Sequence, residues 1–346
     1  MDKIKVLYLV GSNKFSGAEN VVCTIINNMD DSIECLYCCP KGPIEEQLNN
    51  RNINYELIDK LSYNCLKQII KKYKPNIIHA HDYRATFYAS LFYKKCKIIS
   101  HIHVNNPLMN KKTFYSILFN SVFKRISNIV WVSDSALDNY CYKTKVLNKS
   151  QVIYNVIDSK YIEKRTKEYD PKEFFDLVFI GRLSTQKNPE RLIDIIEMIK
   201  QKNDNIRLAI IGDGEKKNEL EELIKSKKVS KNVKMYGFQE NPYPILKNSK
   251  ILIMTSRWEG TPMVELEAQA LGKPIISTPV DGMKKIINND VNGYLADNNN
   301  ELVDHVISYL ADKNYSKLCK NVKDNFKKIN NEKEYFNKIK KLYITE

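Results

Sequence analysis

The stretch DLVFIGRLSTQKNPERLIDIIEMIKQK, residues 176–202, contains the features that decide the fold. The apolar run Asp176–Ile180 has the length and residue types of a buried strand. A polar loop follows, and Pro189 then opens a segment of helical periodicity that extends to Lys202. A buried strand, a polar loop and an amphipathic helix in this order form the repeating unit of a parallel α/β sheet.

The same unit recurs along the whole chain. Six apolar or β-branched runs lie in each half, from Ile4–Val10 to Gly293–Leu295, and helical patterns separate most of them. Near-continuous apolar strands indicate sheets that helices cover on both faces. We therefore expect an α/β protein with two doubly wound parallel sheets, and the length of 346 residues agrees with two domains.

The break between the halves falls in the polar segment Asp158–Glu173, which we interpret as a linker. We predict an N-terminal domain over residues 1–160, a C-terminal domain over residues 161–330 and a final helix over residues 331–346. Polar and glycine residues cluster directly after the predicted strands, where open α/β sheets bind ligands. Two such sheets facing each other would form one deep cleft.

The loop Gly181–Asn188 carries two cations that follow a strand. Arg182 offers a rigid fork of donors and Lys187 a point charge, so together they can hold a diphosphate. A surface turn with two solvated cations is the alternative. The second glycine-containing loop, Gly212-Asp213-Gly214, lacks the third glycine of a dinucleotide fingerprint, and we interpret it as a turn.

The segment EGTPMVELEA, residues 259–268, is the most informative. Gly260 permits a tight turn and Pro262 fits the start of a helix, whose free backbone N–H groups can hold a phosphate. Glu259 precedes this helix and Glu267 lies within it, a pair that suits recognition of sugar hydroxyls. The alternative is a capped helix with surface glutamates.

Four of the five histidines gather on two predicted strands. His79 and His81 alternate on one strand and His101 and His103 on the next, so each pair points to one face near a strand end. We expect a polar cleft wall there, to which Asp82 adds a carboxylate; satisfied core histidines are the alternative. Neither the histidines nor the cysteines show the spacing of a zinc site, and we predict no metal site.

The formal net charge of +14 is unevenly distributed. Residues 1–160 carry +9, and the segment Lys67–Arg125 has 12 basic residues and one acidic residue. Such a charge suggests a polyanionic partner: nucleic acid, an anionic membrane face or phosphorylated substrates. Compositional drift is the alternative, but drift would not concentrate the charge in one segment.

The segment Lys111–Ile126 predicts a helix with an apolar face of Phe114, Leu118, Val122 and Ile126, framed by Lys111, Lys112, Lys124 and Arg125. Cationic ends around an aromatic-rich face suit a helix at a membrane interface; an ordinary helix packed on its sheet is the alternative. No apolar run reaches the length of a membrane span. The first strand does not read as a signal peptide, and the cysteines are expected as free thiols in a reducing cytosol.

The motif Glu259-x7-Glu267 beside Gly181-Arg182 and Lys187, in this order, resembles the family 4 retaining glycosyltransferases with the GT-B fold. Supporting segments are Ser16–Glu19, Pro75–Asp82, Val152–Asn155 and Val291–Leu295. The resemblance implies two Rossmann-like domains facing across a cleft, with the final helix packing back toward the N-terminal domain. The chain departs from the family at Ser16-Gly17, where two glycines are usual, at Asn155-Val156, where Asn-Gly is usual, and at Lys285, where a glutamate is usual.

The resemblance also assigns roles. Arg182 and Lys187 would bind the donor diphosphate, Glu267 the ribose hydroxyls, Glu259 would face the transferred sugar, and His103 would lie near the acceptor. The implied catalytic residues are His103, Arg182, Lys187 and Glu259. The implied donor site is Gly17, Gly181, Arg182, Lys187, Gly237, Phe238, Glu259, Gly260, Thr261, Pro262, Met263, Val264 and Glu267, and the implied acceptor side is Glu19, His81, Asp82, His101 and His103.

The expected reaction is therefore retaining transfer of a sugar from a nucleotide sugar, with UDP-sugars favoured over GDP-sugars and without a cofactor or a divalent metal. A glycan or polyisoprenyl-linked acceptor at the cytoplasmic face of the membrane is expected, with the basic Lys67–Arg125 region against the anionic surface and no nucleic acid as partner. A non-hydrolysing sugar-nucleotide epimerase and a basic nucleic-acid-binding protein are the alternative functions.

Overall fold

The computed structural model describes residues 3–103, 106–259 and 263–344, which divide into two compact units. Unit 1 contains Met1–Val156 and Glu332–Glu346, and unit 2 contains Ile157–Asn331. The C-terminal helix therefore belongs to the same unit as the N-terminal half of the chain.

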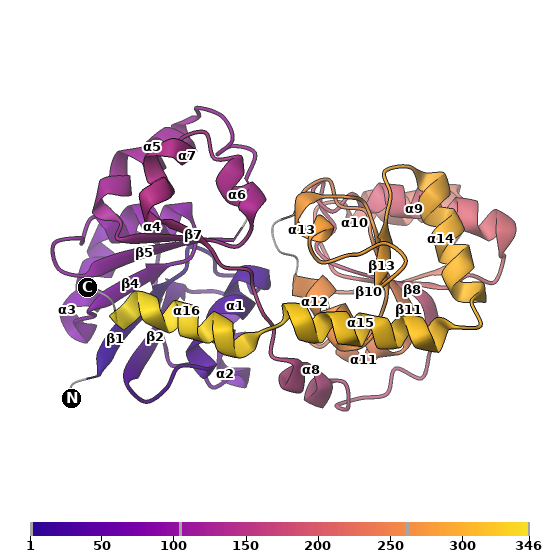
Figure 1. Cartoon of the computed structure of the whole chain (residues 1–346), viewed down its shortest axis with the longest axis horizontal. Coiled ribbons are helices and arrows are strands. Elements are labelled where there is room, and N and C mark those ends of the chain that lie inside the picture. The colour runs from indigo at the N-terminus through magenta and orange to yellow at the C-terminus, as the bar shows by residue number, and fades with distance from the viewer. Residues whose placement is uncertain (1–2, 104–105, 260–262, 345–346) are drawn as a thin grey trace. The chain divides into compact units, whose positions relative to one another are not determined.

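Unit 1 is built on a parallel sheet with the strand order β3-β2-β1-β4-β5-β6-β7 (Figure 1). Its strands are β1 (Ile4–Leu9), β2 (Ile33–Pro40), β3 (Tyr55–Ile58), β4 (Ile77–Ala80), β5 (Lys97–Ile102), β6 (Asn128–Trp131) and β7 (Ser150–Val152). Its helices are α1 (Gly17–Asn27), α2 (Ile44–Asn50), α3 (Tyr63–Tyr73), α4 (Tyr83–Ser90), α5 (Phe114–Val122), α6 (Asp134–Asp138), α7 (Lys143–Val146) and α16 (Glu332–Ile344), with 3-10 turns at Phe123–Arg125 and Leu147–Lys149.

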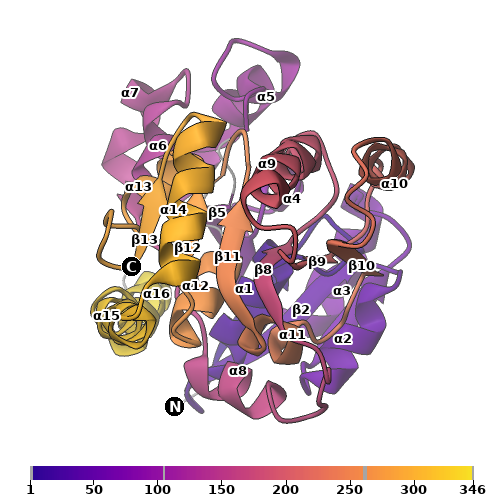
Figure 2. The same cartoon turned by 90° about the vertical axis from the view of Figure 1, so that its right-hand side faces the viewer.

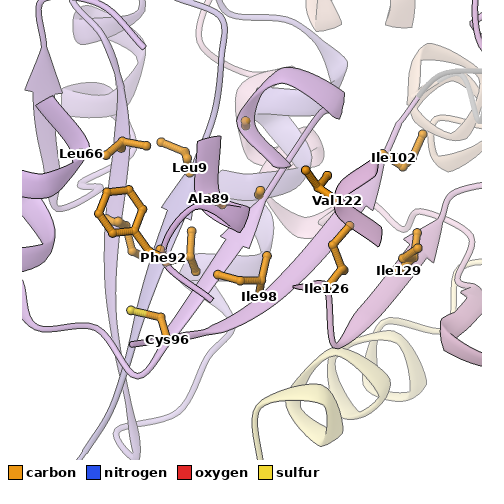
Figure 3. Close-up of a cluster of buried hydrophobic side chains, with 14 of the residues drawn as sticks. Leu9, Leu66, Ala89, Phe92, Cys96, Ile98, Ile102, Val122, Ile126 and Ile129 are labelled. Atoms are coloured by element: carbon orange, nitrogen blue, oxygen red, sulfur yellow. The ribbon is translucent and has the colours of Figure 1, made fainter. Parts of the chain in front are cut away.

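The two faces of this sheet differ in chemistry. One face carries an apolar cluster, in which Leu9 of β1 and Ile98 of β5 pack against Leu66 of α3 and Ala89 of α4 (Figure 3). Alternate residues of a strand point to opposite faces. The residues between these apolar positions therefore point to the other face, where the histidines lie and where α16 packs (Figure 1).

Unit 2 is built on a second parallel sheet with the order β10-β9-β8-β11-β12-β13. Its strands are β8 (Phe175–Ile180), β9 (Leu208–Ile211), β10 (Val233–Gly237), β11 (Ser249–Met254), β12 (Ile275–Ser277) and β13 (Gly293–Leu295). Its helices are α8 (Ser159–Arg165), α9 (Pro189–Lys202), α10 (Lys217–Ser226), α11 (Tyr243–Lys247), α12 (Met263–Ala270), α13 (Asp281–Lys284), α14 (Asn299–Ala311) and α15 (Tyr315–Ile329). Helices α9, α10 and α14 lie along one face of this sheet and α11, α12 and α15 along the other (Figure 2).

The predicted α/β fold with two parallel sheets is confirmed, and three local expectations are corrected. Strand β3 was not predicted, because its sequence YELI mixes polar and apolar residues at the sheet edge. Helix α5 begins at Phe114 instead of Lys111, because Thr113 caps it in a reciprocal pair of hydrogen bonds with Ser116. The segment expected as linker contains α8, whose first turn is capped by Asp158.

Two glycines of unit 2 share a positive φ but differ in their surroundings. Gly212 has φ +145°, and a Cβ there would lie 1.9 Å from the carbonyl oxygen of Gly181. Gly237 has φ +68°, and a Cβ there would meet nothing within 4 Å. The turn Gly212-Asp213-Gly214 is therefore pressed against the loop that carries Arg182.

Replacement of Gly212 by alanine combines backbone strain with overlap against a main-chain oxygen, so we expect Gly212→Ala to lower the free energy of unfolding by about 2–5 kcal/mol. Gly237→Ala is the matched control and should cost only about 1–2 kcal/mol, the strain of a left-handed residue. Urea unfolding followed by circular dichroism measures both. Equal losses for the two variants would contradict the crowding at Gly212.

Candidate active site

The loop between β8 and α9 is held in place by the end of β11. The backbone N–H groups of Lys187 and Asn188 both donate to the carbonyl oxygen of Ser184 at 3.0 Å. The hydroxyl of Thr255 donates to the carbonyl oxygens of Lys187 and Asn188, at 3.1 and 2.9 Å. These bonds fix where the Lys187 side chain leaves the backbone.

Lys187 and Glu259, which are far apart in the sequence, form a largely buried ion pair. The Lys187 ammonium lies 2.5 Å from Glu259 Oε1, and the side chains are only 15% and 6% exposed. Ser256 donates its hydroxyl to the same carboxylate oxygen at 2.6 Å, and Gln186 donates to the carbonyl oxygen of Trp258 at 3.0 Å. The structure thus brings together the two loops that the sequence nominated separately.

Arg182 lies at the start of the same loop with a different environment. Its side chain is 71% exposed and its guanidinium lies 3.2 Å from the carboxylate of Glu215. An exposed pair of this kind contributes little to stability. The guanidinium can therefore turn to a ligand at little energetic cost.

Helix α12 carries Glu267, the second glutamate of the motif Glu259-x7-Glu267. Glu267 is buried and accepts a hydrogen bond from the Tyr243 hydroxyl at 3.1 Å. Met263 is buried and Val264 is half-buried at the start of the helix. The predicted donor residues Gly260, Thr261 and Pro262 lie outside the described residues.

A pocket of about 320 Å³ opens beside Glu259 within unit 2. It is lined by Asn188, Arg191, Ser256, Arg257, Trp258, Glu259, Thr278, Pro279, Val280 and Asp297. At the end of β10, Gly237 leaves open space and Phe238 exposes 64% of its surface. Of the predicted donor residues that the structure describes, Glu259 alone lines this pocket, and Phe238 presents an exposed aromatic ring elsewhere in unit 2.

Glu265 is a residue of this site that sequence reasoning missed. It is fully buried on α12, and both of its carboxylate oxygens lack a hydrogen-bond partner among the described residues. Burial raises the pKa of Glu265 well above its usual value; the nearby Glu259 carboxylate raises it further, and the Lys187 ammonium opposes the shift. The surroundings of Glu265 therefore favour its protonated form beside the Lys187–Glu259 pair.

Unit 1 collects the four histidines on one sheet face, as expected, but His79, His81 and His101 are buried among protein side chains and do not form the exposed polar wall that the sequence suggested. The ring centroids of His79 and His81 are 4.3 Å apart, as are those of His101 and His103. Nδ1 of His81 lies 2.9 Å from Nε2 of His103. Burial lowers the pKa of all four rings, to about 3 for His79 and His103, so the rings are neutral at physiological pH.

The remaining predicted residues of unit 1 hold the polypeptide in place. Asp82 caps α4 by accepting from the N–H of Ala85 at 2.5 Å, and its other oxygen accepts from the N–H of Gly11 at 3.1 Å. Gly17 is the first residue of α1, and Glu19 is buried in its first turn, where it accepts from the Ser16 hydroxyl. Asp82 therefore positions the loop after β1, a role that sequence reasoning did not foresee.

Comparison with known proteins finds a family match for each half of the chain. The sequence profile of the glycosyl transferases group 1 matches residues 161–329, and that of glycosyltransferase family 4 matches residues 15–161. The chain belongs to glycosyltransferase family 4. Crystal structures of HepE from Anabaena have the same GT-B fold; the complex with UDP and glucose has a TM-score of 0.87 at 18% identity, covering 99% of this chain and all of that one.

Three curated relatives of this family 4 glycosyltransferase differ in how much of each chain is matched. An uncharacterized glycosyltransferase of Methanocaldococcus jannaschii is 31% identical over 63% of this chain and 59% of its own length. The UDP-Gal:alpha-D-GlcNAc-diphosphoundecaprenol alpha-1,3-galactosyltransferase of Escherichia coli is 24% identical over 89% of this chain and 88% of its own. The capsular polysaccharide biosynthesis glycosyltransferase CapH of Staphylococcus aureus is 25% identical over 86% of each chain.

The buried carboxyl of Glu265 should reveal itself in the pH dependence of stability. Below about pH 4.5 the Glu265 carboxyl is protonated in both the folded and the unfolded chain. Above that pH the carboxyl ionises in the unfolded chain but stays protonated in the folded one. The free energy of unfolding therefore falls as the pH rises, until the pKa of the folded state is reached. Glu265→Gln removes this effect. We expect its stability relative to wild type to rise by about 1.4 kcal/mol per pH unit over that range.

Urea unfolding at a series of pH values measures this difference. Glu221→Gln, at an exposed position of α10, is the control, and its stability should run parallel to wild type. A constant difference between Glu265→Gln and wild type from pH 4.5 to 7.5 would show that Glu265 is ionised in the folded chain.

Proposed function

We propose that this glycosyltransferase is retaining and transfers a sugar from a UDP-sugar to a hydroxyl of a polyisoprenyl-linked glycan acceptor at the cytoplasmic face of the membrane. The observation that carries the proposal is the fixed Lys187–Glu259 pair next to the flexible Arg182, at the carboxyl ends of β8 and β11. These groups are a preorganised set of charges at the edge where α/β sheets bind ligands.

In the proposed reaction the cations act on the leaving diphosphate. Arg182 can engage two phosphate oxygens at once, and Lys187 supplies a point charge that the loop geometry holds in place. Their charges compensate the negative charge that develops on the leaving oxygen, so the step needs no divalent ion at the phosphates. The free N–H groups at the start of α12 add to this field.

The two glutamates divide the recognition of the donor. Glu267, oriented by the hydroxyl of Tyr243, would accept hydrogen bonds from the ribose hydroxyls. Glu259 lines the pocket of unit 2 and would face the transferred sugar. In a retaining transfer the bond between the anomeric carbon and the phosphate oxygen breaks, and the acceptor hydroxyl oxygen bonds to the anomeric carbon on the same face. The leaving phosphate oxygen takes the proton of that hydroxyl, and His103 of unit 1 would contact the acceptor.

The choice of donor and acceptor is supported by the relatives. HepE was crystallised with UDP and with UDP-glucose, and the Escherichia coli relative is named for a UDP-galactose donor and a diphosphoundecaprenol-linked acceptor. Phe238, exposed at the end of β10, is in a position to stack on a base. No observation favours the epimerase or nucleic-acid alternatives over this function.

A panel of UDP-, GDP- and ADP-sugars tests the donor assignment through slow release of the nucleoside diphosphate. We expect release from a UDP-sugar, unchanged by added Mg²⁺, and a loss of about 100-fold for Arg182→Ala, which removes one charge that stabilises the leaving group. Glu267→Ala should weaken UDP binding. Arg207→Ala is the control, since Arg207 precedes β9 and pairs with Glu173.

Failure of every nucleotide sugar to give release, together with tight binding of DNA, would overturn the proposal in favour of a nucleic-acid-binding protein. Loss of activity in Arg207→Ala equal to that in Arg182→Ala would show that general charge, and not the site, is responsible.

Helix α5 supports the proposed membrane contact. Phe114, Tyr115 and Ile117 are exposed by 73%, 52% and 51%, whereas Phe119 and Val122 pack into the core. The apolar face expected from the sequence is therefore only partly the buried one, and an aromatic patch is left on the surface. The basic residues Lys111, Lys112, Lys124 and Arg125 around it are all exposed. Within the described residues, none of the helices combines the length and apolar character of a membrane span.

Neutralising this patch should weaken membrane binding and spare the donor site. We expect glutamine at Lys111, Lys112, Lys124 and Arg125 to reduce flotation with anionic liposomes at least tenfold, because each cation near such a surface contributes about 1 kcal/mol. Glutamine at Lys317, Lys320, Lys327 and Lys328 of α15 is the matched control. Unchanged flotation of the α5 variant would remove the membrane from the proposal.

A further inference from the structure

The histidine face of unit 1 contains more buried nitrogen atoms than the surrounding side chains can satisfy. His79, His81 and His101 are at most 1% exposed. Nε2 of His79, Nε2 of His81 and both ring nitrogens of His101 have no hydrogen-bond partner among the described residues. Buried polar groups are nearly always satisfied, so these atoms call for a ligand that is absent from the polypeptide.

The strand register explains why the three rings converge. His79 and His81 are two residues apart on and directly after β4, and β4 pairs in parallel with β5, where Ser100 lies opposite Ala80. His101 therefore follows one position after this pair and points to the same face as His81. One ring nitrogen of each of the three histidines lies within 4.8 Å of the other two.

The hydrogen bonds of Tyr343 favour a tautomer of His79 that turns a lone pair toward the centre of the cluster. The Tyr343 hydroxyl of α16 donates to the Tyr8 hydroxyl at 3.0 Å, so its oxygen is free to accept from Nδ1 of His79 at 2.7 Å. With its proton on Nδ1, His79 presents the lone pair of Nε2. Nδ1 of His81 contacts Nε2 of His103, and the His81 tautomer with its proton on Nδ1 would leave Nε2 for a ligand.

We propose that His79, His81 and His101 form a binding site for one divalent transition-metal ion of the zinc class. Imidazole nitrogens suit zinc, copper and nickel, whereas calcium and magnesium prefer oxygen ligands, which this cluster lacks. A set of three imidazoles is a known zinc donor set, and outer partners such as Tyr343 and His103 fix the orientation of ligating rings.

The spacing is close to what such an ion needs. Bonds of about 2.0–2.1 Å in a tetrahedral site place ligand nitrogens about 3.3 Å apart, so shifts of under about 1 Å per ring would suffice. The sequence predicted no metal site because the spacing of its histidines matches no zinc motif; the second shell comes from Tyr8 and Tyr343, at opposite ends of the chain. The site lies in unit 1 and supplies no step of the proposed transfer.

Metal titration of the full chain, prepared without a histidine tag and stripped with a chelator, tests the site. We expect one equivalent of Zn²⁺ to bind, and one equivalent of Co²⁺ to give the visible absorption of tetrahedral coordination that Zn²⁺ then displaces. X-ray absorption of the zinc form should show nitrogen ligands at about 2.0–2.1 Å. Absence of stoichiometric binding would overturn the proposal.

Variants separate ligation from packing. His79→Gln and His101→Gln should lower zinc affinity at least 100-fold, and Tyr343→Phe, which keeps the ring and loses the hydroxyl, about 10- to 100-fold. His305→Gln in α14 of unit 2 is the matched control and should leave the affinity unchanged. Wild-type affinity in all three cluster variants would overturn the proposal. Circular dichroism verifies folding, and if the glutamine variants do not fold, Tyr343→Phe and the absorption spectrum of wild type decide.

Discussion

A parallel strand that is covered by helices on both faces leaves no water for its side chains, and this constraint governs what each position of the two sheets can carry. Apolar residues satisfy it directly, as in the cluster around Leu9 and Ile98. Polar residues on the strands must instead find partners inside the protein. The pleat concentrates the exceptions on one face of unit 1, where Tyr8 and the histidines lie next to one another. Polar groups after the strand ends are not subject to this constraint, and ligands of open α/β sheets bind at that edge.

In unit 2 the same constraint makes the Lys187–Glu259 pair informative. A buried charge is costly unless it is paired, and removal of one partner leaves the other uncompensated. The Lys187–Glu259 pair therefore depends on the geometry of the two loops that carry it. Both of its members also influence the pKa of Glu265. A nucleotide diphosphate that competes for Lys187 would alter the charge around both carboxyl groups. Because Lys187 also lowers the pKa of Glu265, any change in the surroundings of the Lys187 ammonium would act on the Glu265 carboxyl as well.

The sequence predicted the elements of the sheets well because a fully buried strand leaves a strong apolar signal. Edge strand β3 was missed for the same reason, since an edge residue such as Glu56 can remain polar. The start of α5 was misplaced because Lys111 and Lys112 fit a helix as well as a loop, and only the Thr113–Ser116 bonds decide between them.

Site residues that follow strands were predictable, because parallel strands bring their carboxyl ends to one edge. Ser256 follows β11 and could have been found by this rule. Glu265, Tyr243 and Tyr343 could not, because their roles depend on which helix face meets which strand. Such contacts join residues as distant in the sequence as Tyr8 and Tyr343, and the local hydrophobic periodicity of a segment does not predict them.

The discontinuity of unit 1 has a consequence for biosynthesis. Unit 2 is an insertion between Val156 and Glu332, so every residue of it has been translated before α16 leaves the ribosome. All residues of unit 2 are therefore available before α16, while the sheet of unit 1 still has its histidine face uncovered. The hydroxyl of Tyr343 reaches His79 only when the last turn of the chain arrives. Completion of unit 1 is thus a late event, and a chain truncated after α15 would lack the helix that covers the histidine face while all residues of unit 2 remain present.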